Sequence, residues 1–318
     1  MKTADAIIEL LYDRGGFVAL NELTAAAKTH RAGLDRALQE LGRRGHEFEF
    51  VPAQGLRLVR PARLDSHLIE RLLHGRRVGR NVICFRQVAS TNDVAFDSAR
   101  QPDADGLVVL AQHQSAGRGR LGRRWVSAPR TGILMSVLLV DENLPHEALT
   151  IAAGLAVAEG VQAGCGAACR LKWPNDVLLD GAKLAGVLVE VRRAQGRRRL
   201  VVGVGLNVNA APPAAEVDGP ATCLAEHLGH PLERNELAAA LLKKLDDRVA
   251  AIAAGRLEEL HKAWLAHCDM LNRRIRLQDG EATHEGRVLD VDPMEGLVLC
   301  LDDGRHVHVP ARGATVLP

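Results

Sequence analysis

The strongest constraint on the fold lies between residues 81 and 270, where short apolar segments alternate with amphipathic ones. Alternation of strand-like and helix-like periodicity predicts a sheet covered by helices. The Asp180-Gly181 pair, inside a long apolar run, is a tight-turn signal, so hairpins should make the sheet mixed. We expect strands within 81–88, 106–112, 132–140, 169–173, 177–191 and 198–208, and helices within 91–100, 146–163, 234–254 and 257–268.

The two ends of the chain have other patterns. Three helical segments and a strand-turn-strand run in residues 1–62 outline a winged helix-turn-helix. Residues 63–80 are expected to form a connector with one helix, and residues 81–270 the central domain. Residues 271–318 carry short alternating runs with Asp-Gly turns, which predicts a small β-barrel. The fold class is therefore α+β, a mixed α/β chain of three domains.

Composition narrows the function classes. A net charge of +2 over 318 residues gives no global basic field, so any contact with nucleic acid must be local. The sequence shows neither a signal peptide nor an unbroken apolar run of membrane-spanning length, so we expect a cytoplasmic protein without a membrane partner. The six cysteines are scattered, and Cys165 and Cys169 lack the second pair that zinc spacing requires.

The stretch QSAGRGRLGRRW at 114–125 combines glycines with arginines. Glycines let backbone N–H groups approach an anion, and guanidinium groups bind phosphate or carboxylate bidentately. The stretch is neither a Walker A loop nor a Rossmann fingerprint. The plain alternative is a solvated basic loop.

Four further stretches carry polar residues at the ends of expected elements. They are STND (90–93), KWPND (172–176), KLAGVLVE (183–190) and GVGLNVN (203–209). Small residues in a strand allow close approach of a ligand, and a carboxylate can hold a metal that bridges nucleotide phosphates. Taken alone, each stretch is as typical of an ordinary polar turn or helix cap as it is of a ligand site.

Together, in this order and spacing, these motifs resemble those of the biotin protein ligases. The N-terminal segment makes the chain similar to the bifunctional members, which also repress the biotin operon, and the likeness extends to an SH3-like C-terminal barrel. The resemblance implies an enzyme that activates biotin with ATP to biotinyl-AMP. It then transfers biotin to a lysine of the biotin carboxyl carrier protein of acetyl-CoA carboxylase.

The resemblance also implies site residues. The catalytic cations are Lys183, Arg118 and Arg120. Biotin contacts are Ser90, Thr91, Asn92, Gln114, Gly117, Arg118, Gly119, Arg120, Lys183, Gly186, Leu188, Gly203 and Gly205. Nucleotide contacts are Arg118, Arg120, Trp125, Lys172, Asn175, Asp176 and Asn207, with Asp176 also implied for Mg²⁺. Trp173 is a second candidate for adenine stacking or for shaping the site, and Arg312 a candidate from the C-terminal barrel.

One departure concerns Leu121, which stands where many relatives carry a third arginine. The missing charge is expected to weaken retention of the intermediate or to alter dimerisation linked to the loop.

The repressor role would depend on Arg31 and Arg36 of the expected recognition helix, which can reach phosphates or guanine edges. Asp35, Glu40 and acidic residues of the wing oppose such binding. The resemblance further implies operator DNA as a partner and a homodimer promoted by biotinyl-AMP, whose surface the carrier domain also uses.

Two alternative functions are also consistent with these residues. The first is a ligand-sensing transcription factor with a vestigial catalytic site, and the second is a related lipoate ligase. The first is opposed by the presence of Arg118, Lys172, Lys183, Asp176 and Asn207. The GRGR loop followed by KWPND favours biotin over lipoate.

Overall fold

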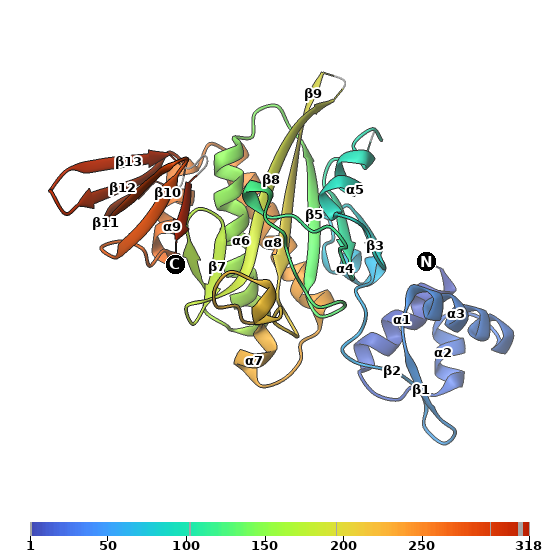
Figure 1. The fold of residues 1–318 in the computed structure, drawn as a ribbon. Coiled ribbons are helices and arrows are strands. Elements are labelled where there is room, and N and C mark those ends of the chain that lie inside the picture. Colours follow the sequence, from blue (N-terminus) through green and yellow to red (C-terminus); the bar gives the residue numbers. More distant parts are fainter. Residues whose placement is uncertain (1, 102, 195, 293, 311–313, 318) are drawn as a thin grey trace.

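The structure, a computed structural model, describes residues 2–101, 103–194, 196–292, 294–310 and 314–317. Figure 1 shows a central sheet with helices, a small helical unit at the N-terminal end and a separate sheet at the C-terminal end. The expected mixed α+β class is confirmed. Arg312 lies outside the described residues.

The central sheet contains β3 (Asn81–Phe85), β4 (Leu107–Ala111), β5 (Ile133–Val140), β6 (Arg170–Lys172), β7 (Asp176–Leu179), β8 (Ala182–Ala194) and β9 (Arg197–Leu206). Its order is β3-β4-β5-β9-β8-β7-β6. Only the β3–β4 pairing is parallel, and the remaining neighbours are antiparallel, so the expectation of a mixed sheet holds. Asp180 and Gly181 both have positive φ, as a tight hairpin between β7 and β8 requires.

Strand β4 shows how the sheet separates two apolar layers. Val108 and Leu110 belong to the large cluster that includes helices α6 (His146–Cys165) and α8 (Arg234–Ala253). Leu107 and Val109 belong to the cluster that includes residues of α5 (Thr91–Ser98). Successive side chains of a strand point to opposite faces, so the two clusters cover opposite faces of the sheet.

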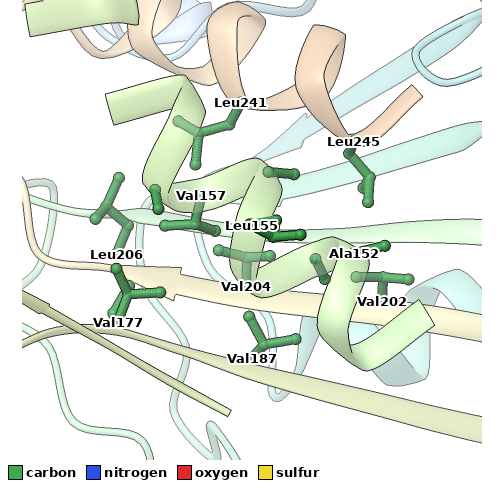
Figure 2. Packing of buried hydrophobic residues seen from close by; sticks show 14 of the residues in the cluster. Ala152, Leu155, Val157, Val177, Val187, Val202, Val204, Leu206, Leu241 and Leu245 are labelled. Atoms are coloured by element: carbon green, nitrogen blue, oxygen red, sulfur yellow. The ribbon is translucent and has the colours of Figure 1, made fainter. Parts of the chain in front are cut away.

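Helix α6 is the centre of the main core. Figure 2 shows Ala152, Leu155 and Val157 of this helix packed between Val187, Val202 and Val204 of the sheet and Leu241 and Leu245 of α8. Among the helices described, α6 alone is long and apolar enough to cross a membrane, and most of it is buried inside the protein. Burial on all sides explains its apolar composition.

The N-terminal unit contains α1 (Thr3–Arg14), α2 (Leu20–Ala26), α3 (Arg31–Arg44) and a hairpin of β1 (Phe48–Val51) and β2 (Gly55–Leu58). These are the elements that the sequence predicts, and they surround an apolar cluster of their own. Helix α4 (Ser66–Leu72) follows, with Leu68 in that cluster and Ile69 in the main core. The domain boundaries at 62, 80 and 270 remain predictions.

Buried polar contacts join this unit to the central part. Asp65, 3% exposed, accepts hydrogen bonds from Arg44 Nε at 2.9 Å and pairs with His46 Nε2 at 2.8 Å. Its backbone N–H donates to Asn235 Oδ1 of α8 at 2.8 Å. Burial alone would raise the pKa of Asp65, but the hydrogen bond from His46 and the charge of Arg44 outweigh it and lower the pKa to about 2.

Beyond α7 (Leu224–Leu228), α8 and α9 (Leu257–His267), the chain ends in an antiparallel sheet. Its strands are β10 (Arg274–Asp279), β11 (Ala282–Asp292), β12 (Gly296–Leu301), β13 (His306–Pro310) and β14 (Ala314–Leu317), in the order β13-β12-β11-β10-β14. The sequence predicts a barrel; in the part of the chain described, the edge strands β13 and β14 are not paired with each other. Leu277 and Val288 continue the main core across the expected boundary at 270.

Candidate active site

A cavity of about 450 Å³ opens beside β8 and β9, a size suited to a small-molecule ligand. It lies between the start of α5, the loop 114–125 and the segment 212–221. Its lining residues are Ser90, Thr91, Asn92, Gln114, Arg118, Gly119, Arg120, Arg123, Arg124, Trp125, Val126, Met135, Asn175, Asp176, Lys183, Gly186, Val187, Leu188, Gly203, Val204, Gly205, Asn207, Pro212 and 216–221.

Glycines form the floor of the cavity. Gly186 of β8 and Gly205 of β9 are directly opposite each other in the ladder, and Leu188 is opposite Gly203. The Trp125 indole lies on this floor: an added Cβ at Gly186 would be 3.0 Å from the ring, and one at Gly205 would overlap it. A side chain at either position would therefore move the tryptophan.

Hydrogen bonds order the polar wall at the start of α5. Gln114 Oε1 accepts from the Thr91 backbone N–H at 2.6 Å and from its hydroxyl at 2.9 Å. The buried Ser136 hydroxyl lies 2.7 Å from Thr91 Oγ1 and 2.6 Å from Asn92 Oδ1. Asn92 Nδ2 in turn donates to Glu190 Oε2 at 2.6 Å. The wall is thus rigid and offers amide and hydroxyl groups.

Lys183, at the start of β8, pairs with Asp176 of β7: Nζ and Oδ1 are 2.6 Å apart. The ammonium also lies 5.8 Å from the centroid of the Trp125 ring, within the range of a cation–π contact. Burial lowers the pKa of Arg120, with Asp176 acting in the opposite direction. Asp176 is therefore the carboxylate that faces both cations.

Loop 114–125 folds back on itself. The backbone N–H of Gly119 donates to Arg123 O at 2.7 Å, and that of Trp125 donates to Gly117 O at 3.0 Å. Gly117 accommodates this turn because an added Cβ would lie 2.9 Å from Trp125 O. Leu121 at its tip is 60% exposed and has φ of 55°, a left-handed conformation uncommon for leucine.

Among the described residues that the sequence predicts to bind biotin or nucleotide, all but Gly117, Lys172 and Trp173 line this one cavity. Gly117 shapes the loop behind the lining. Lys172 and Trp173 line a smaller neighbouring cavity of about 50 Å³, together with Arg120, Asp176 and residues 314–316 of β14. Trp173 is 1% exposed, so its ring lies in the core and cannot stack on a ligand in the main cavity.

Sequence reasoning missed the segment 212–221 and the arginines Arg123 and Arg124. The segment reaches the cavity because β8 holds it: Lys183 N–H donates to Pro220 O, and Thr222 N–H donates to Lys183 O. The sequence signal for this segment is weak: a proline-rich stretch that contains Asp218-Gly219-Pro220. The two arginines belong to the basic loop and extend its charge.

The donor set fits Mg²⁺ only together with nucleotide phosphates. Within the described residues, no three side chains of His, Cys, Asp or Glu converge as metal ligands. Asp176 supplies one carboxylate, and the buried Asn207 Oδ1 in the cavity wall has no hydrogen-bond partner. Mg²⁺ is commonly held by one or two carboxylates plus phosphates, so this pair is compatible with it.

Comparison with known proteins gives the class. Residues 84–209, which contain the loop, the floor and the polar wall, match the model of the biotin/lipoate A/B protein ligase family. The fold and the cavity therefore define a protein ligase of this class. The biotin–acetyl-CoA-carboxylase ligase of Mycobacterium tuberculosis is 37% identical over 267 residues, covering 80% of this chain and 97% of that protein. The chain belongs to the biotin protein ligases, as its motifs predict.

Two further relatives extend the likeness. The bifunctional ligase/repressor BirA of Bacillus subtilis is 28% identical over 306 residues, 94% of each chain. The structure of the biotin protein ligase of Aquifex aeolicus in complex with biotin and ATP is 27% identical, with a TM-score of 0.65 over 75% of this chain and 99% of that chain.

Proposed function

We propose that this chain joins biotin to a carrier protein in two steps, using ATP. A biotin carboxylate oxygen attacks the α-phosphorus of ATP, the bond to pyrophosphate breaks, and biotinyl-AMP forms. A lysine amine of the carrier then attacks the acyl carbon and AMP leaves. The observation that carries this proposal is one cavity in which the glycine floor, the polar wall and the cations meet.

The polar wall and the glycine floor suit biotin. Ser90, Thr91, Asn92 and Gln114 would bind the ureido ring through hydroxyl and amide groups. Ser136 already holds Thr91 and Asn92 in place, Glu190 holds Asn92, and Thr91 holds Gln114. The floor at Gly186, Gly203 and Gly205, with Leu188, leaves room for a flat bicyclic ligand once Trp125 shifts. Preordered groups of this kind reduce the entropic cost of binding.

The cations Lys183, Arg118 and Arg120 would stabilise the negative charge of the biotin carboxylate and the α-phosphate. Carboxylate and α-phosphate are both anions, so their approach requires cations in a site shielded from water. In the resting enzyme Asp176 holds Lys183 in place, and an incoming phosphate competes for the same ammonium. Gly117 and Gly119 let the loop 114–125 close over the reactants.

Trp125, Asn175, Asp176 and Asn207 are proposed nucleotide contacts, and Lys172 lies at the smaller cavity, where it would reach a phosphate beyond Arg120. Mg²⁺ would be held by Asp176, with Asn207 beside it, and would neutralise phosphate charge when bound. Both roles are compatible with the placement of these residues around one opening.

The test is biotin-dependent ATP–pyrophosphate exchange. Lys183→Ala should lower the exchange rate about 100-fold or more, since one charge-stabilising group is typically worth that much. The matched control is Lys262→Ala on α9, an exposed lysine away from the cavity. A near-normal rate for Lys183→Ala would remove its assigned role. Exchange supported by lipoate and not by biotin would establish the lipoate alternative, and no exchange with either would leave the vestigial-site alternative.

A second function, repression of transcription, is supported by the surface of α3. Arg31 and Arg36 are both exposed on this helix, which a hairpin of β1 and β2 follows, as in DNA-binding winged helices. The similarity to the Bacillus subtilis ligase/repressor over 94% of the chain favours it. We propose operator DNA as a partner, a homodimer promoted by biotinyl-AMP, a carboxyl carrier protein as acceptor and a cytoplasmic location.

A further inference from the structure

Arg118 of the glycine-rich loop is held by two carboxylates outside the loop. Its Nη1 donates to Asp93 Oδ2 at 2.6 Å and its Nη2 to Asp93 Oδ1 at 2.8 Å, a bidentate pair. Nη2 also lies 3.4 Å from Glu190 Oε2. Bidentate pairs of this geometry are the strongest common side-chain hydrogen bonds, and they fix orientation as well as distance.

Asp93 is well placed to serve as an anchor. It lies in the first turn of α5, where the helix dipole favours a negative charge. It also accepts from Arg192 Nη2 of β8 at 3.2 Å, and that guanidinium stacks over Phe96 of α5 at 4.1 Å. The hydrogen bonds from Arg118 lower the pKa of Asp93, so its carboxylate stays ionised at neutral pH.

Holding Arg118 holds the whole loop. Arg118 and Arg124 form an antiparallel bridge, and Trp125 N–H donates to Gly117 O, so both arms of the loop move together. Trp125 at its end lies on the glycine floor. A contact at Asp93 therefore acts on the lining of the cavity without Asp93 itself lining it.

We propose that Asp93 is a positioning residue that latches loop 114–125 through Arg118 and so sets how long the acyl-adenylate is retained. The Nε–H of Arg118 takes no part in either carboxylate pair, which leaves it for an anion while the latch is closed. The inference rests on the proposed function, because retention is defined only once an adenylate is made.

The first experiment compares Asp93→Asn with Asp97→Asn. Asp97 lies one turn further along α5, is exposed and undergoes the same change of charge, so it is the matched control. Biotinyl-AMP formed on the enzyme is chased with unlabelled biotin and ATP, and its release is followed. Asp93→Asn should release biotinyl-AMP about three- to tenfold faster. This effect is at the low end for the loss of a charged hydrogen bond, because the Arg118–Asp93 pair is partly exposed to solvent. Asp97→Asn should match the wild type.

The second readout needs no ligand. Trypsin cuts after arginine, so loop opening in the free enzyme appears as cleavage at 118–124, mapped by mass spectrometry. Asp93→Asn should speed this cleavage several-fold. Asp93→Glu, which keeps the charge, should be cleaved at a rate close to that of the wild type. In an Arg118→Ala background, Asp93→Asn should add nothing, because its partner is already gone.

The outcomes separate the two proposals. If wild-type protein makes no biotinyl-AMP, the proposed function fails, and only the trypsin result then bears on the latch. If Asp93→Asn makes the adenylate and retains it as long as the wild type does, the latch is overturned. The latch is equally overturned if Asp93→Asn changes retention to the same extent with and without Arg118.

Discussion

Gly205 shows how one missing side chain shapes the site. It has an ordinary strand conformation, and its value is the space above it, which the Trp125 indole fills. The same holds for Gly186 on the neighbouring strand. A methyl group at Gly205 cannot coexist with the tryptophan in its present place, so the strand would keep its ladder and the loop would give way.

We therefore expect Gly205→Ala to raise the KM for biotin about tenfold or more, because the added methyl group occupies space that the ligand needs on the floor, and overpacking of this kind costs roughly 1–3 kcal/mol. Biotin-dependent pyrophosphate exchange measures the KM. A change in tryptophan fluorescence reports the displaced ring, because Trp173 and Trp264 are buried in the core and unaffected by the substitution. Gly154→Ala is the control: it is a buried glycine of α6, but its Cβ would meet its nearest neighbour at an ordinary 3.7 Å. Equal KM values in the two variants would mean that the floor does not define the ligand site.

At this scale the sequence predicts residue types better than their contacts. The spacing of Gly203 and Gly205 in a strand indicates a ligand-facing surface, which is where they lie. The partner of Arg118 is not predictable, since Asp93 is 25 positions away and comes close only when α5 packs on the sheet. Likewise, Trp173 has a motif position suited to stacking, but the core takes up its ring.

Among the elements, α4 and the residues before it join the N-terminal unit to the rest. Asp65 caps α4 by accepting from Leu68 N–H and at the same time binds Arg44, His46 and α8. Its lowered pKa means that the folded protein favours the charged carboxylate. This contribution to stability is present above about pH 4, which is near the pKa of an aspartate in the unfolded chain, and it is lost as the pH falls toward 2.

Asp65→Asn should accordingly lower the free energy of unfolding at pH 7 by about 2 kcal/mol, the equivalent of a pKa shift of nearly two units. The difference from the wild type should shrink below pH 4, where the carboxyl of the unfolded chain becomes protonated. Chemical denaturation at pH 7 and pH 3 measures it, with exposed Asp97→Asn as the reference. A loss of stability that is the same at both pH values would show that charge is not the cause.

Helices and strands of the central sheet are largely predictable because their periodicity is strong and their turns carry Asp-Gly or proline signals. The short helix α7 and the 3₁₀ turn at Arg120–Gly122 are not, since so few residues give no period. The sequence predicts that the C-terminal strands close into a barrel, but the described edge strands β13 and β14 are not paired with each other. The local pattern cannot decide this, because pairing between edge strands depends on contacts remote in sequence.

For the molecule as a whole, the prediction that remains to be tested is a complex with operator DNA whose formation requires biotin and ATP. Arg31→Ala and Arg36→Ala should each weaken operator binding, and removing one phosphate-binding cation should lower the salt slope by about one unit. Arg43→Ala, exposed at the other end of α3, is the control. Mobility shift with biotin-synthesis promoter DNA, with and without biotin plus ATP, measures binding, and sedimentation measures dimerisation. Active ligase that shifts no DNA under either condition would end the repressor proposal.

The buried helix α6 has a consequence for how the protein is made. Its apolar surface is covered partly by β8 and β9 and partly by α8, which leave the ribosome after it. At about 5–20 residues per second, roughly ninety further residues take on the order of 5–20 s to synthesise. Until α8 emerges, the apolar surface of α6 that it will cover has no partner. We therefore expect this segment to be a binding site for chaperones during translation, well before any biotin can reach the protein.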